Sequence, residues 1–155
     1  MLTISAEEQL ARFGPGGGMY RIVTKAADTG GLIFALEATE PPGGGPPLHT
    51  HAGEEEYFAV LEGEITFFID GNVRTVGAGG SAFVPRGLPH SFKNCSERVA
   101  RVLVVFTPGS IEGFFNYGLP VGPGGNERPS DEHLMNRIAE LGPRFGLELL
   151  GASPL

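Results

Sequence analysis

Apolar and polar positions alternate in short runs along most of the chain, and clusters of Gly and Pro separate these runs. Runs of this kind predict β-strands. They cover residues 20–25, 32–39, 65–69, 73–76, 81–84 and 99–106. Asp70-Gly71-Asn72 joins two of them in a predicted hairpin. Many short strands linked by tight turns are typical of an antiparallel barrel or sandwich. The run 99–106 is apolar at nearly every position, so we expect terminal helices or a second subunit to cover its outer face.

The two ends of the chain show helical spacing instead. Residues 3–13 begin with a capping box and predict one short helix. Residues 110–118, which open on a serine suited to an N-cap, and residues 130–141 predict two more helices. The Gly- and Pro-rich stretch 118–130 between them predicts a connector or lid. The tail 145–150 is apolar enough to dock on the rest of the protein.

Three of the four histidines lie close to one carboxylate in a pattern that suits metal binding. On an extended strand His49 and His51 point to the same face. Glu56 follows after a turn, and His90 would reach the same point from a distant strand. Neutral imidazoles with one carboxylate suit first-row divalent metals, whereas calcium and magnesium prefer oxygen ligands. The sequence therefore predicts a metal site at these four residues.

Strand parity also suggests which side chains surround this site. Phe58 and Val60 share the side of Glu56, and Phe92 shares the side of His90, so these three are candidate pocket walls. Core packing would demand the same residues. Glu56 is a candidate catalytic base, because a ligating carboxylate can accept a proton from a substrate hydroxyl.

Composition and charge narrow the functional classes. The chain has 155 residues, which suits one domain of ordinary size. Its 25 glycines and 13 prolines suit many tight turns. A net charge of −7 without a Lys/Arg cluster makes nucleic acid and anionic membranes poor partners. The single cysteine, Cys95, suggests a reducing compartment, and no run approaches the ~20 apolar residues of a membrane helix. We expect a soluble cytoplasmic protein, with His133 as a solvated helix residue.

The spacing of the glycines, prolines and ligands resembles a known superfamily. The chain reads Gly43-x5-His49-x-His51-x4-Glu56-x6-Gly63, then Gly79-x5-Pro85-x-Gly87-x2-His90-x3-Asn94. Both motifs resemble the two signatures of the cupin superfamily, with every position filled. The resemblance implies one all-β domain over residues 1–155, with a small jelly-roll barrel at about 19–107 and a helical extension at 108–155. It also implies one divalent transition metal per chain (iron, manganese, nickel, cobalt, copper or zinc) and favours a homodimer.

Residues 46–49 and 106–115 resemble bacterial cupins related to quercetin 2,3-dioxygenase. That similarity implies O₂-dependent cleavage of a small aromatic or enolic substrate. Several flavonol dioxygenases carry two cupin units and this chain carries one, so the substrate stays open. A non-redox isomerase, cyclase, dehydratase or decarboxylase would use the same ligands. A binding or sensor module is disfavoured, because structural zinc is usually enclosed by Cys-rich ligands and no helix-turn-helix is attached.

Overall fold

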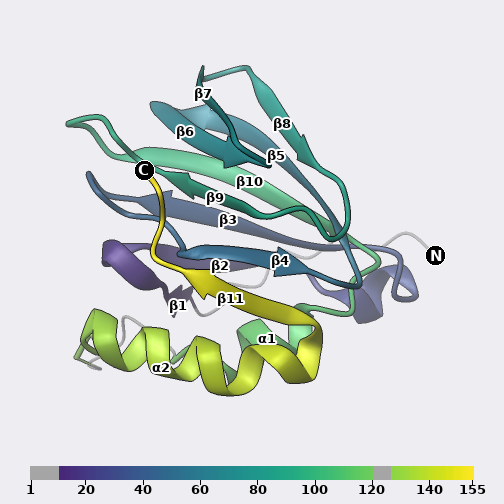
Figure 1. Ribbon diagram of the computed structural model, residues 1–155. Helices are drawn as coiled ribbons and strands as arrows, with labels where there is room; N and C mark the ends of the chain where they lie inside the picture. Colours follow the sequence, from purple (N-terminus) through teal and green to yellow (C-terminus); the bar gives the residue numbers. More distant parts are fainter. Residues whose placement is uncertain (1–10, 121–126) are drawn as a thin grey trace.

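Two antiparallel sheets pack face to face in the computed structural model, which describes residues 11–120 and 127–155 (Figure 1). The six-stranded sheet has the order β1 (Ala11–Phe13), β2 (Met19–Thr24), β3 (Phe34–Glu40), β10 (Ala100–Thr107), β5 (Glu55–Glu62), β8 (Ser81–Val84). The five-stranded sheet has the order β11 (Leu147–Gly151), β4 (Leu48–His51), β9 (His90–Lys93), β6 (Glu64–Ile69), β7 (Asn72–Gly77). The predicted all-β jelly roll is confirmed.

The strands form where alternation predicts them. β2 pairs with β3, and β6 pairs with β7, both antiparallel. The β6–β7 turn places Asp70 at φ 47° and Gly71 at φ 84°, the two positive values that a tight hairpin turn of the I′ type requires. Pro85 follows β8 directly. Proline has no backbone N–H to donate to a neighbouring strand, so the strand ends there.

Side chains from the inner faces of both sheets fill the barrel. Along β10, Ala100, Val102, Val104 and Phe106 are buried, and the residues between them are more exposed. Aromatic rings from the opposite sheet meet this layer and form a packed core, and a cavity adjoins the histidines.

Within one chain, the outer face of β10 is only partly covered. Val105 lies next to Tyr57 of β5, which lies next to Phe83 of β8. Tyr57 is 43% exposed and Phe83 is 55% exposed. Figure 1 shows α1 (Glu112–Tyr117) and α2 (Asp131–Leu141) at the opposite end of the molecule from β7 and β8, so the terminal helices leave this row of apolar side chains open. The homodimer that would cover it stays a prediction.

The C-terminal extension is only partly helical, which corrects the prediction for residues 108–155. α2 begins as predicted, because the Ser130 hydroxyl accepts a hydrogen bond of 3.2 Å from the His133 backbone N–H. After a short 3₁₀ turn at Gly142–Phe145, the tail becomes β11 and pairs antiparallel with β4. The reason is the unpaired edge of β4, whose backbone groups find partners in the tail.

Two further helix predictions change in detail. α1 begins at Glu112 without a side-chain cap, because the Ser110 hydroxyl donates to the Glu54 carboxylate instead. The end of the predicted helix 3–13 is wrong: residues 11–13 form β1, which pairs with β2 and buries Phe13. Residues 3–10, and residues 121–126 of the predicted connector, lie outside the described part of the chain. Among the residues that are described, no helix has the length and apolar character needed to cross a membrane.

Asn94 fixes the loop that leads from β9 to β10. It is fully buried, and its amide donates to the Glu40 carbonyl at 2.8 Å and to the Arg98 carbonyl at 2.6 Å. Asn94→Ala should lower the free energy of unfolding by roughly 2–4 kcal/mol, because the buried Glu40 carbonyl and the partly buried Arg98 carbonyl lose their partner. Urea denaturation of both proteins measures this change.

Asn72→Ala is the matched control for that experiment. Asn72 also donates to two carbonyls, at 3.4 Å and 3.3 Å, but it lies in an exposed turn. We expect its loss to change stability by less than about 0.5 kcal/mol. Equal effects at the two positions would contradict the role of Asn94.

Candidate metal centre

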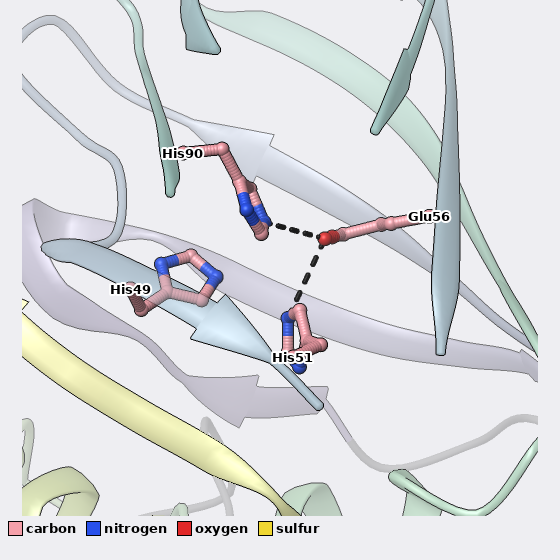
Figure 2. Close-up of side chains that lie close together, drawn as sticks. All are labelled: His49, His51, Glu56 and His90. Atoms are coloured by element: carbon pink, nitrogen blue, oxygen red, sulfur yellow. Dashed lines mark hydrogen bonds and ion pairs between the residues drawn. The ribbon is translucent and has the colours of Figure 1, made fainter. Parts of the chain in front are cut away.

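Four buried side chains converge between the two sheets (Figure 2). His49 and His51 come from β4, His90 is the first residue of β9, and Glu56 reaches across from β5. One donor atom from each lies within 4.8 Å of all the others. The four residues predicted from spacing therefore meet at one point, as the motif implies.

Strand geometry explains the meeting of the three imidazoles. His49 and His51 are two positions apart on β4, so both face the interior while Thr50 between them does not. β4 pairs antiparallel with β9, and His49 lies directly opposite His90. Their ring centres are 4.3 Å apart, which places two ligand candidates side by side across one ladder.

Backbone carbonyls set the tautomers of two of the imidazoles. His49 Nδ1 lies 2.7 Å from the Pro47 carbonyl, and His90 Nδ1 lies 2.9 Å from the Leu88 carbonyl. A carbonyl oxygen can only accept, so we assign the hydrogen of each ring to Nδ1. The Nε2 lone pair of each ring is then free for a metal, as is usual for histidine ligands held by an outer hydrogen bond.

Glu56 shows that this cluster needs a cation. One of its oxygens, Oε2, is 2.8 Å from His90 Nε2 and 3.4 Å from His51 Nε2 (Figure 2). A lone pair on the His90 Nε2 would face a carboxylate oxygen at hydrogen-bond distance, which is repulsive unless a positive charge lies between them. Either a second proton on His90 or a metal ion supplies it. A metal ion also satisfies the other two imidazoles, so the residues fit a divalent metal.

The pKa shifts agree with this donor set. Burial, aided by the charges of His90 and His51, holds the pKa of His49 well below 6.5, so this ring is neutral. Burial alone would raise the pKa of Glu56, but the charge of His90 and hydrogen bonds from His51 and His90 outweigh it and place this pKa well below its ordinary value. Burial alone would lower the pKa of His90, and Glu56 raises it. A neutral imidazole and an ionised carboxylate are the forms that bind metals.

A cavity adjoins the cluster and extends to the C-terminal elements. Its volume is about 50 Å³, compared with roughly 10–15 Å³ for a single water. Among the described residues, its lining consists of Pro15, Tyr20, Leu36, Pro46, Pro47, His49, His51, Glu56, Phe92, Val104, Phe106, Phe114, Phe115, Leu119, Ile138 and Leu147. This lining contains no Lys or Arg. The cavity is therefore small and apolar apart from the ligands and Tyr20.

The structure places the three predicted pocket residues differently. Phe92 lines the cavity. Phe58 and Val60 are absent from its lining and pack in the barrel core, where the ring of Phe58 contacts those of Phe67 and Phe92. The parity was right, but β5 runs away from the metal end after Glu56, so side chains farther along it face other strands.

The sequence left open which side chains close the cavity. Phe114 and Phe115 come from α1, Ile138 from α2 and Leu147 from β11. The C-terminal elements thus form one wall of the cavity. The helical apolar spacing of α1 and α2 showed that each has a buried face, but not which part of the barrel that face covers.

The region that contains the cluster matches a known protein family. Residues 36–106 match the model of the cupin domain, which includes all four clustered residues. The chain carries a cupin domain. The cupin barrel and its ligand cluster were thus recognisable before the fold was known.

Known cupins similar to this chain differ in activity. Quercetin 2,3-dioxygenase of Bacillus subtilis is 29% identical over 64% of this chain, and the transcriptional regulator PuuR of Escherichia coli is 31% identical over 66%. The matches span 29% and 55% of those two proteins. The structure of a predicted oxalate decarboxylase from Thermotoga maritima is 27% identical, covers 70% of this chain and 99% of its own, and has a TM-score of 0.58.

Alanine in place of His49, His51 or His90 should lower metal affinity by more than about a hundredfold, because each change removes a ligand rather than an outer partner. Metal content after dialysis against a weak chelator, measured by mass spectrometry, tests this. The exposed His133 supplies the control, and His133→Ala should retain the metal content of the unmodified protein. Full metal content in all three ligand variants would contradict the site.

The stabilisation that nickel confers should grow with pH. The raised pKa of His90 stabilises the metal-free fold fully below its ordinary value of 6.5, and this contribution is lost as pH rises through the folded-state pKa. Metal binding changes in the opposite direction, because fewer protons compete for the imidazoles. The difference in unfolding free energy between nickel-loaded and metal-free protein should widen as pH rises toward the raised pKa of His90, by about 1.4 kcal/mol per pH unit for each displaced proton, and should level off above that pKa. Urea denaturation of both forms measures it, and a difference independent of pH would contradict the assigned ligands.

Proposed function

We propose that this protein is a metal-dependent enzyme that acts on a small enolic or aromatic molecule, and that its reaction is an O₂-dependent dioxygenation. One observation carries the proposal: a buried cluster of three imidazoles and one carboxylate borders an apolar cavity. Four protein ligands leave two positions of an octahedral shell open. A divalent ion bound there would supply Lewis acidity and, for a redox-active metal, electrons toward O₂.

The residues of this chain have separate tasks in that reaction. The three imidazoles would hold the ion, and the Pro47 and Leu88 carbonyls fix two of the rings. Glu56 is ionised and buried beside the cavity, and its lowered pKa makes it a weak base. A substrate hydroxyl coordinated to a bound metal would have a lowered pKa, and Glu56 could then accept its proton as an enolate forms. The apolar walls exclude water, which strengthens the attraction between the enolate and the site.

The lining of the cavity favours a substrate of low charge. The described lining residues include no Lys or Arg, so a second carboxylate or a phosphate would have no cation apart from the metal. A planar enol fits between aromatic walls and needs only its oxygen atoms at the metal. The cavity volume of about 50 Å³ is far below the ~300–1,000 Å³ of drug-sized pockets. A substrate of a few heavy atoms fits as the fold stands, whereas a flavonol requires the C-terminal wall to move.

Some of the similar proteins support the proposed dioxygenation, and others support alternative functions. The likeness to the dioxygenase of Bacillus subtilis favours O₂ chemistry, and the likeness to a predicted oxalate decarboxylase favours a non-redox reaction with the same ligands. The likeness to PuuR supports a third candidate, a ligand-binding sensor. Only an enzyme converts a bound compound, so turnover separates the sensor from the other two.

Oxygen consumption tests the proposal directly. Protein reconstituted with iron, manganese, nickel or cobalt is supplied with small β-diketones, enolic acids and flavonols, and O₂ uptake is followed with an electrode. We expect metal-dependent uptake, faster with the small enols than with flavonols. Conversion of a substrate without O₂ uptake would overturn the dioxygenase and support the isomerase, cyclase, dehydratase or decarboxylase class.

Glu56→Gln separates the base role from the ligand role. The glutamine amide keeps an oxygen atom that can coordinate a metal, but it accepts protons poorly. We therefore expect kcat to fall by roughly 10²–10⁴-fold. Metal content is measured in the same samples, and rates are compared at equal metal occupancy. Full activity in a metal-loaded Glu56→Gln protein would rule out Glu56 as the base.

A further inference from the structure

Glu40 is a carboxyl group buried outside the metal centre. It lies on the inner face of β3 and has no exposed surface. Neither of its carboxyl oxygens has a hydrogen-bond partner of good geometry among the described residues. A buried carboxyl without partners destabilises a fold by roughly 1–3 kcal/mol or more, so its presence needs an explanation other than stability.

Glycines make room for this carboxyl and for its neighbour Tyr20. A β-carbon at Gly18 or Gly44 would lie 2.6 Å from the Glu40 Oε2 atom. A β-carbon at Gly14 would lie 2.5 Å from the Tyr20 ring and 2.8 Å from its hydroxyl. No side chain fits at these distances, so the backbone around the pair is shaped to accommodate two buried polar groups.

Tyr20 connects Glu40 to the cavity. It is the one polar side chain among the described lining residues that is not a ligand candidate. Its ring packs edge-on against Phe115, and the charge of Glu56 acts on its hydroxyl. The hydroxyl also interacts with Glu40, although the contact falls short of a full hydrogen bond. A reorientation of either side chain would complete it.

We propose that the Tyr20 hydroxyl donates a hydrogen bond to the substrate in the cavity, and that Glu40 is the positioning residue that orients this hydroxyl. The assignment rests on the proposed metal-dependent function and adds a hydrogen-bond donor to the cavity, since among the described lining residues Tyr20 carries the one polar side chain that is not a ligand candidate. Tyr20 is then a catalytic residue, and Glu40 acts through it.

The protonation of Glu40 decides which way the Tyr20 hydrogen points. Burial raises the pKa of Glu40 to about 8, against smaller lowering contributions from Tyr20 and Arg128. Below this value the carboxylic acid donates to the Tyr20 oxygen, and the Tyr20 O–H is free for the substrate. Above it the carboxylate accepts the Tyr20 O–H, and the donor is lost. Tyr20, Arg128 and, through Tyr20, Glu56 are the charged or titratable groups that act on the pair.

Azide binding to cobalt-loaded protein tests this without turnover. Azide is a small anion that stays ionised over the pH range used, coordinates cobalt and accepts hydrogen bonds. Its dissociation constant is measured by visible absorption from pH 6.5 to 9 in the unmodified protein and in Tyr20→Phe and Glu40→Gln. Tyr117→Phe is the matched control, because Tyr117 is 73% exposed. Cobalt content is determined in every sample.

Tyr20→Phe should weaken azide binding about tenfold at pH 7, and Tyr117→Phe should not change it. The unmodified protein should bind azide as Glu40→Gln does at pH 6.5 and about fivefold more weakly than Glu40→Gln at pH 9, because the glutamine amide keeps donating to Tyr20 whereas most of Glu40 is ionised. Competition from hydroxide is common to both proteins and cancels. Coinciding curves for these two, or unchanged binding in Tyr20→Phe at full cobalt content, would overturn the proposal. Failure of the unmodified protein to hold cobalt would overturn the metal-dependent function as well.

Discussion

A buried carboxylate that needs a cation is the constraint on which this structure depends. Glu56 reaches from one sheet toward imidazoles on the other, and its pKa shows that it remains charged in an apolar interior. Removing a carboxylate from water costs several kcal/mol, and only a close positive charge offsets that. The centre therefore works as a clamp between the two layers of the barrel. It holds β5 against β4 and β9 at the end of the molecule where the hydrophobic core is interrupted by the cavity.

The surroundings of the two buried carboxyls shift their pKa values in opposite directions. Glu56 lies among imidazoles and is ionised, whereas Glu40 lies among glycines and stays protonated at neutral pH. One barrel thus contains a base and an acid, both fixed by their surroundings rather than by their residue type. Tyr20 lies between the acid and the cavity, so proton donors and acceptors approach a bound molecule from different strands.

Much of this arrangement could be predicted from the sequence because it depends on strict periodicity. Alternation located β2, β3 and the β6–β7 hairpin, and the spacing of His49, His51, Glu56 and His90 identified the cluster. What depends on long-range packing could not be predicted. The tail after α2 has apolar residues without a clear period, and only the open edge of β4 makes it a strand. Glu40 has no sequence pattern that marks it as buried, because its enclosure depends on Gly18 of a distant turn as well as on Gly44.

The pairing of β11 with β4 has a consequence for how the protein is made. Leu147 and Leu149 lie opposite His51 and His49 in the ladder, so the strand that carries two ligands is completed by a segment that leaves the ribosome well after that strand. During synthesis the histidines emerge first, on a strand with an open edge and without the wall that Leu147 provides. The nascent chain can present its ligands to a metal early, but it can enclose that metal only after the C-terminal strand has been added.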